Sequence, residues 1–224
     1  MEPLHRWDVS PEEAVAIQQR LRERVREAAP VALEQIHRIA GIDASYKDLA
    51  RAAVVVFSFP ELERLDEAVA ERASPFPYVP GLLSFREAPA VLDAIANLRV
   101  RPDLLMCDGQ GIAHPRRFGI ASHLGVYLDL PSIGVAKSRL TGRYDEPGPN
   151  PGDRSALTYR GERLGEVLRA KPRTNPLFIS IGYKIDLPTA VAVVERCLRG
   201  YRLPEPTRAA HNLAAAAARG LGSG

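Results

Sequence analysis

The stretch IAGIDASY, residues 39–46, is followed after a polar turn by the apolar run VVVF, residues 54–57. Both segments are rich in residues that favour β-strands, and the short connection between them predicts an antiparallel hairpin. Residues 61–73 fit a strand or a helix, of which we favour the strand, and further strands are predicted at residues 103–107, 132–136 and 177–185. Meandering strands followed by alternating strands and helices predict an α/β fold, with a mixed sheet that is flanked by helices.

Length and composition suit a single domain over residues 1–224. The chain has 224 residues, of which 46% are hydrophobic and 25% are charged, and we find no internal repeat. It holds no run of 18 apolar residues and no apolar segment near its start, so we expect neither a membrane span nor a signal peptide. Cys107 and Cys197 stand in apolar stretches without metal-ligand spacing, which predicts buried free thiols in a cytoplasmic protein.

Charge is distributed unevenly along the chain. Residues 1–100 hold 12 Lys+Arg against 16 Asp+Glu, whereas residues 101–224 hold 18 against 11. The basic residues are 26 arginines and 4 lysines, and arginine can bind phosphate through two parallel hydrogen bonds. A basic half indicates a polyanionic partner such as nucleic acid, although an arginine-rich genome or a thermophilic host would give the same bias.

Carboxylates stand where apolar segments are interrupted or end. Asp43 lies within an apolar strand, where a charge is costly unless it pairs or binds a metal. Asp108 follows an apolar strand and opens the glycine-rich turn 109–111, where a ligand can approach the backbone. With Glu87 they predict an oxygen-rich Mg²⁺ site for phosphodiester hydrolysis. Two simpler interpretations stay open, namely Asp43 on a solvated strand face and Asp108 as a turn cap.

Glu87 also has a possible structural explanation. Ser84 and Glu87 have the spacing of a helix capping box, but Pro89 would then fall beyond the first helical position, where proline fits poorly. We therefore expect the helix to begin nearer Ala88, which leaves the Glu87 carboxylate free for another role.

Basic side chains supply candidates for phosphate chemistry. Lys137 ends a strand, where it can neutralise a phosphate or orient an attacking water. His114 and His211 are candidates for ligand or proton-transfer roles, and His114 with Arg116 and Arg117 suits a phosphate contact. An exposed lysine, structural histidines and a solvated basic loop are the simpler interpretations.

The segment Pro77-Tyr78-Val79-Pro80 is the most unusual part of the sequence. A tyrosine between prolines is held stiffly and presents its ring at low entropic cost. A rigid wedge of this kind can fill the space that an extruded base leaves in a duplex. The simpler interpretation is an aromatic ring that packs into the core.

Taken together, these segments resemble the endonuclease V family. The matching motifs are GID at 41–43 with SY at 45–46, PYVPGLL at 77–83 running into FRE at 85–87, DG at 108–109 with GIAHPRR at 111–117, GIASH at 119–123, and GVAK at 134–137. Their order and spacing fit as well, and the resemblance extends over nearly the whole chain.

The resemblance implies a ribonuclease H-like fold and a monomeric DNA repair enzyme that acts on deoxyinosine. It implies Mg²⁺-dependent hydrolysis of the second phosphodiester bond 3′ to the lesion, which leaves 3′-hydroxyl and 5′-phosphate ends, and Mn²⁺ is expected to substitute for Mg²⁺. Such an activity is that of a deoxyribonuclease V. The implied partner is DNA with deoxyinosine or another deaminated base.

The same resemblance assigns roles to individual residues. Asp43 and Asp108 would hold Mg²⁺ with Glu87 completing the acidic cluster, Lys137 would assist at the phosphate, and His211 matches a family position near the metal. Tyr78 would act as the wedge. The pocket for the flipped base would be lined by Leu83, Gly109 and Ile120. The chain departs from many relatives at Gln110, where they have histidine, so base preference or metal geometry is expected to differ.

Three other functions compete with this one. An inosine-specific endoribonuclease on the same fold would use the same wedge and carboxylates. A non-catalytic binder of damaged or branched DNA would not need Asp43, Glu87, Asp108 and Lys137. A Mg²⁺-dependent phosphatase of small molecules would need neither the Tyr78 wedge nor a basic second half.

Overall fold

The predicted hairpin forms two neighbouring strands inside the sheet, next to the edge strand β3. In the computed structural model, which describes residues 4–220, β1 (Arg38–Tyr46) pairs antiparallel with β2 (Ala50–Ser58). The segment predicted as a third strand forms β3 (Arg64–Arg72), which pairs antiparallel with β2 at one edge of the sheet. The strand predictions for this part of the chain are therefore confirmed.

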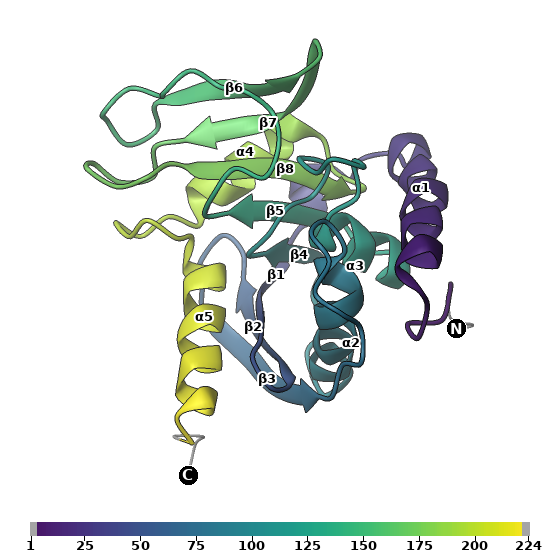
Figure 1. Cartoon of the computed structure of the whole chain (residues 1–224). Coiled ribbons are helices and arrows are strands. Elements are labelled where there is room, and N and C mark those ends of the chain that lie inside the picture. The colour runs from purple at the N-terminus through teal and green to yellow at the C-terminus, as the bar shows by residue number, and fades with distance from the viewer. Residues whose placement is uncertain (1–3, 221–224) are drawn as a thin grey trace.

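The described residues form one eight-stranded mixed sheet in the order β3-β2-β1-β4-β5-β8-β7-β6 (Figure 1). β4 (Leu104–Cys107) runs parallel to β1, and β5 (Ser132–Ala136) runs parallel to β4. The remaining strands pair antiparallel, and they are β6 (Arg154–Tyr159), β7 (Glu162–Leu168) and β8 (Leu177–Tyr183). Parallel strands β1, β4 and β5 end at the same edge, so residues that follow them are brought together. The predicted ribonuclease H-like α/β fold is confirmed.

Helices cover both faces of the sheet (Figure 1). On one face, α2 (Leu83–Ala96) and α3 (Ile120–Leu128) pack against Ala40 and Ile42 of β1. On the other face lie α4 (Leu187–Arg196) and α5 (Glu205–Ala218). The 17-residue helix α1 (Pro11–Glu27) is capped by Ser10 and packs against α3, and a 3₁₀ turn (Leu33–Gln35) leads into β1. The side chains of alternate residues of β1 are thus buried on opposite faces of the sheet, as strand geometry requires.

Gly41 sets how closely α5 approaches β1. A Cβ atom at this position would lie 2.0 Å from the carbonyl oxygen of Pro206, a distance that no side chain tolerates. Glycine therefore lets the first turn of α5 lie directly on the strand. Asp43 shares the face of Gly41 because it is two residues further along β1, and His211 reaches it from the next turns of α5.

The start of α2 was predicted wrongly. The helix begins at Leu83 rather than near Ala88, and Pro89 lies inside it. Leu82 makes no side-chain cap, and the Ser84 hydroxyl is hydrogen-bonded to His123 Nδ1 at 2.9 Å. Tertiary packing offsets the missing backbone hydrogen bond: Phe85, which is 1% exposed, contributes about 1.5–3 kcal/mol on burial, and Ala88 and Val91 of the same helix are buried as well.

Two other expectations concern the chain as a whole. Within residues 4–220, no helix combines the length and apolar character that a membrane span requires. Cys107 and Cys197 are both buried and unpaired, which confirms the predicted free thiols. Of the predicted domain, residues 1–3 and 221–224 lie outside the described part of the chain.

Candidate active site

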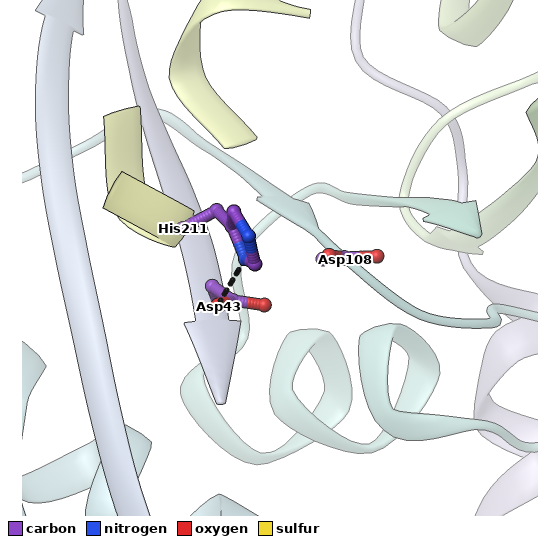
Figure 2. Close-up of side chains that lie close together, drawn as sticks. All are labelled: Asp43, Asp108 and His211. Atoms are coloured by element: carbon purple, nitrogen blue, oxygen red, sulfur yellow. Dashed lines mark hydrogen bonds and ion pairs between the residues drawn. The ribbon is translucent and has the colours of Figure 1, made fainter. Parts of the chain in front are cut away.

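Asp43, Asp108 and His211 converge at the edge where the parallel strands end (Figure 2). Ile42 of β1 is paired with Cys107 of β4, so the residues that follow them, Asp43 and Asp108, lie side by side. One ligand atom from each of Asp43, Asp108 and His211 lies within 4.8 Å of the other two. Three elements far apart in sequence therefore supply one compact group of metal-ligand side chains.

His211 is tied to Asp43. Its Nδ1 lies 3.1 Å from Asp43 Oδ2, and the carboxylate accepts this hydrogen bond. Asp43 is only 9% exposed, whereas about half of the His211 side chain faces solvent. With Nδ1–H as the donor, the Nε2 lone pair of a neutral ring is left for a metal or a proton.

Asp108 is paired with Lys137. The Lys137 Nζ forms an ion pair with Asp108 Oδ2. Burial raises the pKa of the Asp108 carboxyl, and the Lys137 ammonium works against that rise. In such a pair the carboxylate can bind a cation, and the ammonium group can offset the charge of a phosphate.

Glu87 approaches this group from α2. The side chain is 7% exposed. Burial raises the pKa of its carboxyl to about 8, Asp43 and Asp108 add to the rise, and Arg86 opposes it. Glu87 is outside the set whose ligand atoms lie within 4.8 Å of one another, but it is close enough to repel both aspartates.

The donor set fits a hard divalent cation. Three carboxyl groups face one another with little solvent, and such an arrangement is unfavourable unless a positive charge joins it. Carboxylate oxygens and an imidazole nitrogen are ligands that divalent cations accept. No thiol takes part, since Cys107 and Cys197 are buried in the core and burial raises their pKa values.

A pocket of about 410 Å³ opens beside the acidic group. Its walls include the three predicted base-pocket residues Leu83, Gly109 and Ile120, together with Glu87 and Asp108. The volume suits a small ligand such as one nucleobase. Other wall residues are Tyr78, Val79, Pro80, Gln110, Lys137, Ser138, Arg139 and Leu140. The structure thus brings the predicted pocket and the predicted carboxylates together.

Tyr78, Val79 and Pro80 of the Pro77–Pro80 segment line this pocket. Tyr78 is 71% exposed, so its ring does not pack into the core. Phe76, which is buried and stacked on Phe85, anchors the start of the segment. The predicted wedge requires an exposed tyrosine on an anchored segment, and Tyr78 has this placement.

The end of the same segment is held by the carbonyl oxygen of Gly81. It accepts hydrogen bonds from Gln18 Nε2 at 3.0 Å, His114 Nε2 at 3.0 Å and Arg116 Nη2 at 2.7 Å. Burial lowers the pKa of His114 to about 4, so the ring is neutral at physiological pH. His114 Nδ1 accepts the backbone N–H of Arg116, which fixes Nε2 as the donor.

The side chains predicted to contact phosphate are hydrogen-bonded within the protein. His114 and Arg116 are bonded to Gly81, and Arg117 donates from Nε to Glu162 at 2.8 Å. All three side chains thus have partners inside the protein, and their contact with phosphate stays a prediction.

Sequence analysis missed two residues near the site. Gln18 lies four residues after the buried Ala14, where a polar side chain on an apolar stripe signals a specific partner. Arg202 lies in the connection between α4 and α5 and donates to the Lys137 carbonyl. No pattern in its own segment marks Arg202.

Comparisons with known proteins agree on one family. A family model described as Endonuclease V matches residues 19–212. An Endonuclease V from Roseiflexus sp. (strain RS-1) is 55% identical over 209 residues, which cover 93% of this chain and 93% of that protein.

Solved structures are similar over the same extent. Endonuclease V from Streptomyces avermitilis has a TM-score of 0.89 at 42% identity, covering 97% of this chain and 96% of that one. Ciona intestinalis Endonuclease V, solved in complex with a DNA containing an inosine followed by a ribo-adenosine, has a TM-score of 0.79 at 27% identity. That match covers 94% of this chain and 98% of the other.

Proposed function

Because the chain belongs to the endonuclease V family, we propose that it is a DNA repair endonuclease that nicks DNA beside deaminated purines. The cut falls at the second phosphodiester bond 3′ to deoxyinosine and leaves 3′-hydroxyl and 5′-phosphate ends. The observation that carries this proposal is the convergence of Asp43, Asp108 and His211 within 4.8 Å, beside a pocket large enough for one base.

Asp43 and Asp108 would hold Mg²⁺, with Glu87 completing the acidic group. When bound, such a cation supplies a nucleophilic water at neutral pH and stabilises charge on the leaving oxygen. The Asp43 carboxylate is oriented by His211, and the Asp108 carboxylate is oriented by Lys137. Lys137, on the pocket wall, would also offset the charge of the phosphate under attack.

Recognition of the deaminated base is assigned to the apolar wall of the pocket and to Tyr78. Leu83 and Ile120 would pack on the extruded base, and Gly109 leaves room for it, since a Cβ there would lie 2.7 Å from Ile120 Cγ2. Tyr78 would stack in the gap that the base leaves in the duplex, as its exposure allows.

An endoribonuclease that cuts at inosine is the second candidate. It is favoured by the Ciona relative, which was solved with a DNA in which a ribo-adenosine follows the inosine. The acidic group and the wedge serve either nucleic acid, so substrate assays must decide between them.

The test is Mg²⁺-dependent cleavage of matched DNA and RNA oligonucleotides that carry one inosine, with the cut position mapped. We expect a single nick in the DNA at the second bond 3′ to the lesion, and Mn²⁺ in place of Mg²⁺ should support it. Cleavage of the RNA alone would favour the endoribonuclease. Binding of the DNA without any nick would favour a non-catalytic binder.

Gel filtration would test the expected monomeric state, and fractionation of the host cell would test the expected cytoplasmic location.

A further inference from the structure

Lys137 is the first residue beyond the sheet at the candidate active site. The last pairing of β5 is Ala136 with Phe178 of β8, and the chain from Lys137 onward is irregular. Lysine is a flexible side chain with a point charge, so its ammonium is positioned only as well as its backbone is. Contacts that fix this irregular backbone therefore decide where the charge lies.

Arg202 holds the carbonyl group of Lys137. Its Nη2 donates to Lys137 O at 2.6 Å, and its Nε donates to Asn175 O at 2.8 Å. Asn175 belongs to the turn that precedes β8. One guanidinium thus ties the exit of β5 to the entry of its sheet neighbour β8.

Gln110 holds the next carbonyl group from another side. Its Nε2 donates to Ser138 O at 2.9 Å. Gln110 is two residues beyond Asp108, the ion-pair partner of Lys137. Asp108 and Lys137 are therefore linked twice, once through their charges and once through this side-chain bond to the backbone.

We propose that Arg202 and Gln110 are positioning residues that hold Lys137 against Asp108, and that they act on the nicking reaction through Lys137. The inference deepens the proposed function and rests on it. Arg202 is not among the residues that line the pocket, whereas Gln110 lines it and has its Nε2 bonded to Ser138 O. Their role is to keep two consecutive carbonyl groups, and thereby the Lys137 stem, in one position.

The expected effect follows from the cost of misplacing a catalytic group. A displacement of about 1 Å lowers a rate by up to about 10²-fold. We expect Arg202→Met to lower kcat for nicking by about 10–100-fold with little change in KM. Arg202→Lys can still donate to Lys137 O and should recover part of the rate. Gln110→Met should cause a smaller loss, of about 3–10-fold, since one neutral hydrogen bond is removed.

A double-mutant cycle separates positioning from a general effect on the fold. In a Lys137→Ala background, Arg202→Met should cause no further loss of kcat, because the side chain that it positions is already gone. Arg199→Met is the matched control: Arg199 lies in the same connection and donates to Arg196 O and Leu198 O. It should leave kcat unchanged in both backgrounds.

Hydrogen–deuterium exchange of residues 137–142 gives a second measurement that needs no activity. Exchange should accelerate in Arg202→Met and not in Arg199→Met. Equal losses of kcat from Arg202→Met with and without Lys137, or unchanged exchange, would overturn the inference. A wild-type protein that nicks while Arg202→Met keeps full kcat overturns only this inference. A wild-type protein that does not nick overturns the proposed function, and the exchange result still decides whether Arg202 orders the segment.

Discussion

The acidic centre and the wedge segment are built in different ways. Asp43 and Asp108 follow paired residues of two central strands, so the pairing of β1 with β4 places them side by side. Tyr78 stands on an irregular segment outside the sheet, fixed through the Gly81 carbonyl with its three donors. The difference indicates that bond breaking and lesion recognition depend on separate parts of the fold, which substitutions should separate.

Removing a carboxylate of the acidic centre should have the largest effect. Asp43→Ala or Asp108→Ala is expected to lower nicking by at least about 10³-fold, because each removes a candidate metal ligand. Lesion binding and the unfolding temperature should change little, since Asp43→Ala also relieves repulsion with Glu87. Single-turnover nicking and thermal unfolding measure the two. Asp145→Ala, an exposed carboxylate elsewhere, is the control. Full activity in either active-site variant would contradict the assignment of bond breaking to the acidic centre.

The pKa of Glu87 predicts a pH-dependent stability in protein stripped of divalent cations. Its folded-state pKa of about 8 lies above the ordinary 4.5, owing to burial first and then to Asp43 and Asp108. The folded state therefore binds the proton more tightly, and the stability from this group is complete below pH 4.5 and is lost as pH rises toward 8.

Glu87→Gln should remove that loss. We expect the metal-free variant to be more stable than the wild type at pH 8 and similar to it at pH 5, with chemical denaturation as the measurement. Mg²⁺ should narrow the difference at pH 8, because it stabilises the ionised carboxylate of the wild type. Identical pH profiles of the two metal-free proteins would show that the folded-state pKa of Glu87 is not raised.

Tyr78→Ala tests the recognition side of the comparison. Stacking of a base on an aromatic ring is worth about 1–3 kcal/mol, so nicking of deoxyinosine in a duplex should fall by about 10-fold or more. A single-stranded substrate, whose lesion needs no extrusion, should be cut at nearly the wild-type rate. Leu65→Ala, which removes an exposed side chain on β3, is the control. Equal losses on both substrates would place Tyr78 in the chemical step.

Gly81→Ala should have the smallest effect on the chemistry. Gly81 has φ +79°, and a Cβ there would lie 2.6 Å from Arg116 Nη2, so the substitution strains the backbone and disturbs the Gly81 contacts. We expect a loss of about 1–3 kcal/mol in the free energy of unfolding, with a loss of duplex lesion preference like that of Tyr78→Ala. Gly152→Ala, with φ +90° and nothing within 4 Å, isolates the backbone cost alone. Matching stability losses in the two variants would mean that the contacts around Gly81 contribute nothing.

The sequence predicted the acidic centre better than the segments around it. Asp43 and Asp108 stand out because a charge interrupts or ends an apolar strand, and strand ends meet at one edge of a sheet. The role predicted for Glu87 was argued from a helix start near Ala88 that is wrong, since capping chemistry says nothing about the burial of Phe85 that helps decide that start. The placement of His211 depends on Gly41, which matters only once α5 is known to lie on β1.

Long-range hydrogen bonds to carbonyl groups were beyond prediction. Gln18 and Arg202 bind backbone atoms of irregular segments that are distant in sequence, and such contacts leave no periodic pattern. The basic run that contains His114 and Arg116 predicted phosphate contacts, yet in the structure both side chains hold Gly81. Composition indicated the charge of that loop and gave no indication of its partners.

The central claim is that carboxylates distant in sequence share a divalent cation at one edge of the sheet. The most direct test is a crystal structure of the protein soaked in Mn²⁺, with the ion located by its anomalous scattering. We predict an ion bound by both Asp43 and Asp108 in the wild type, and its loss in Asp108→Ala. An ion bound elsewhere, or the same ion retained when Asp108 is removed, would contradict the account.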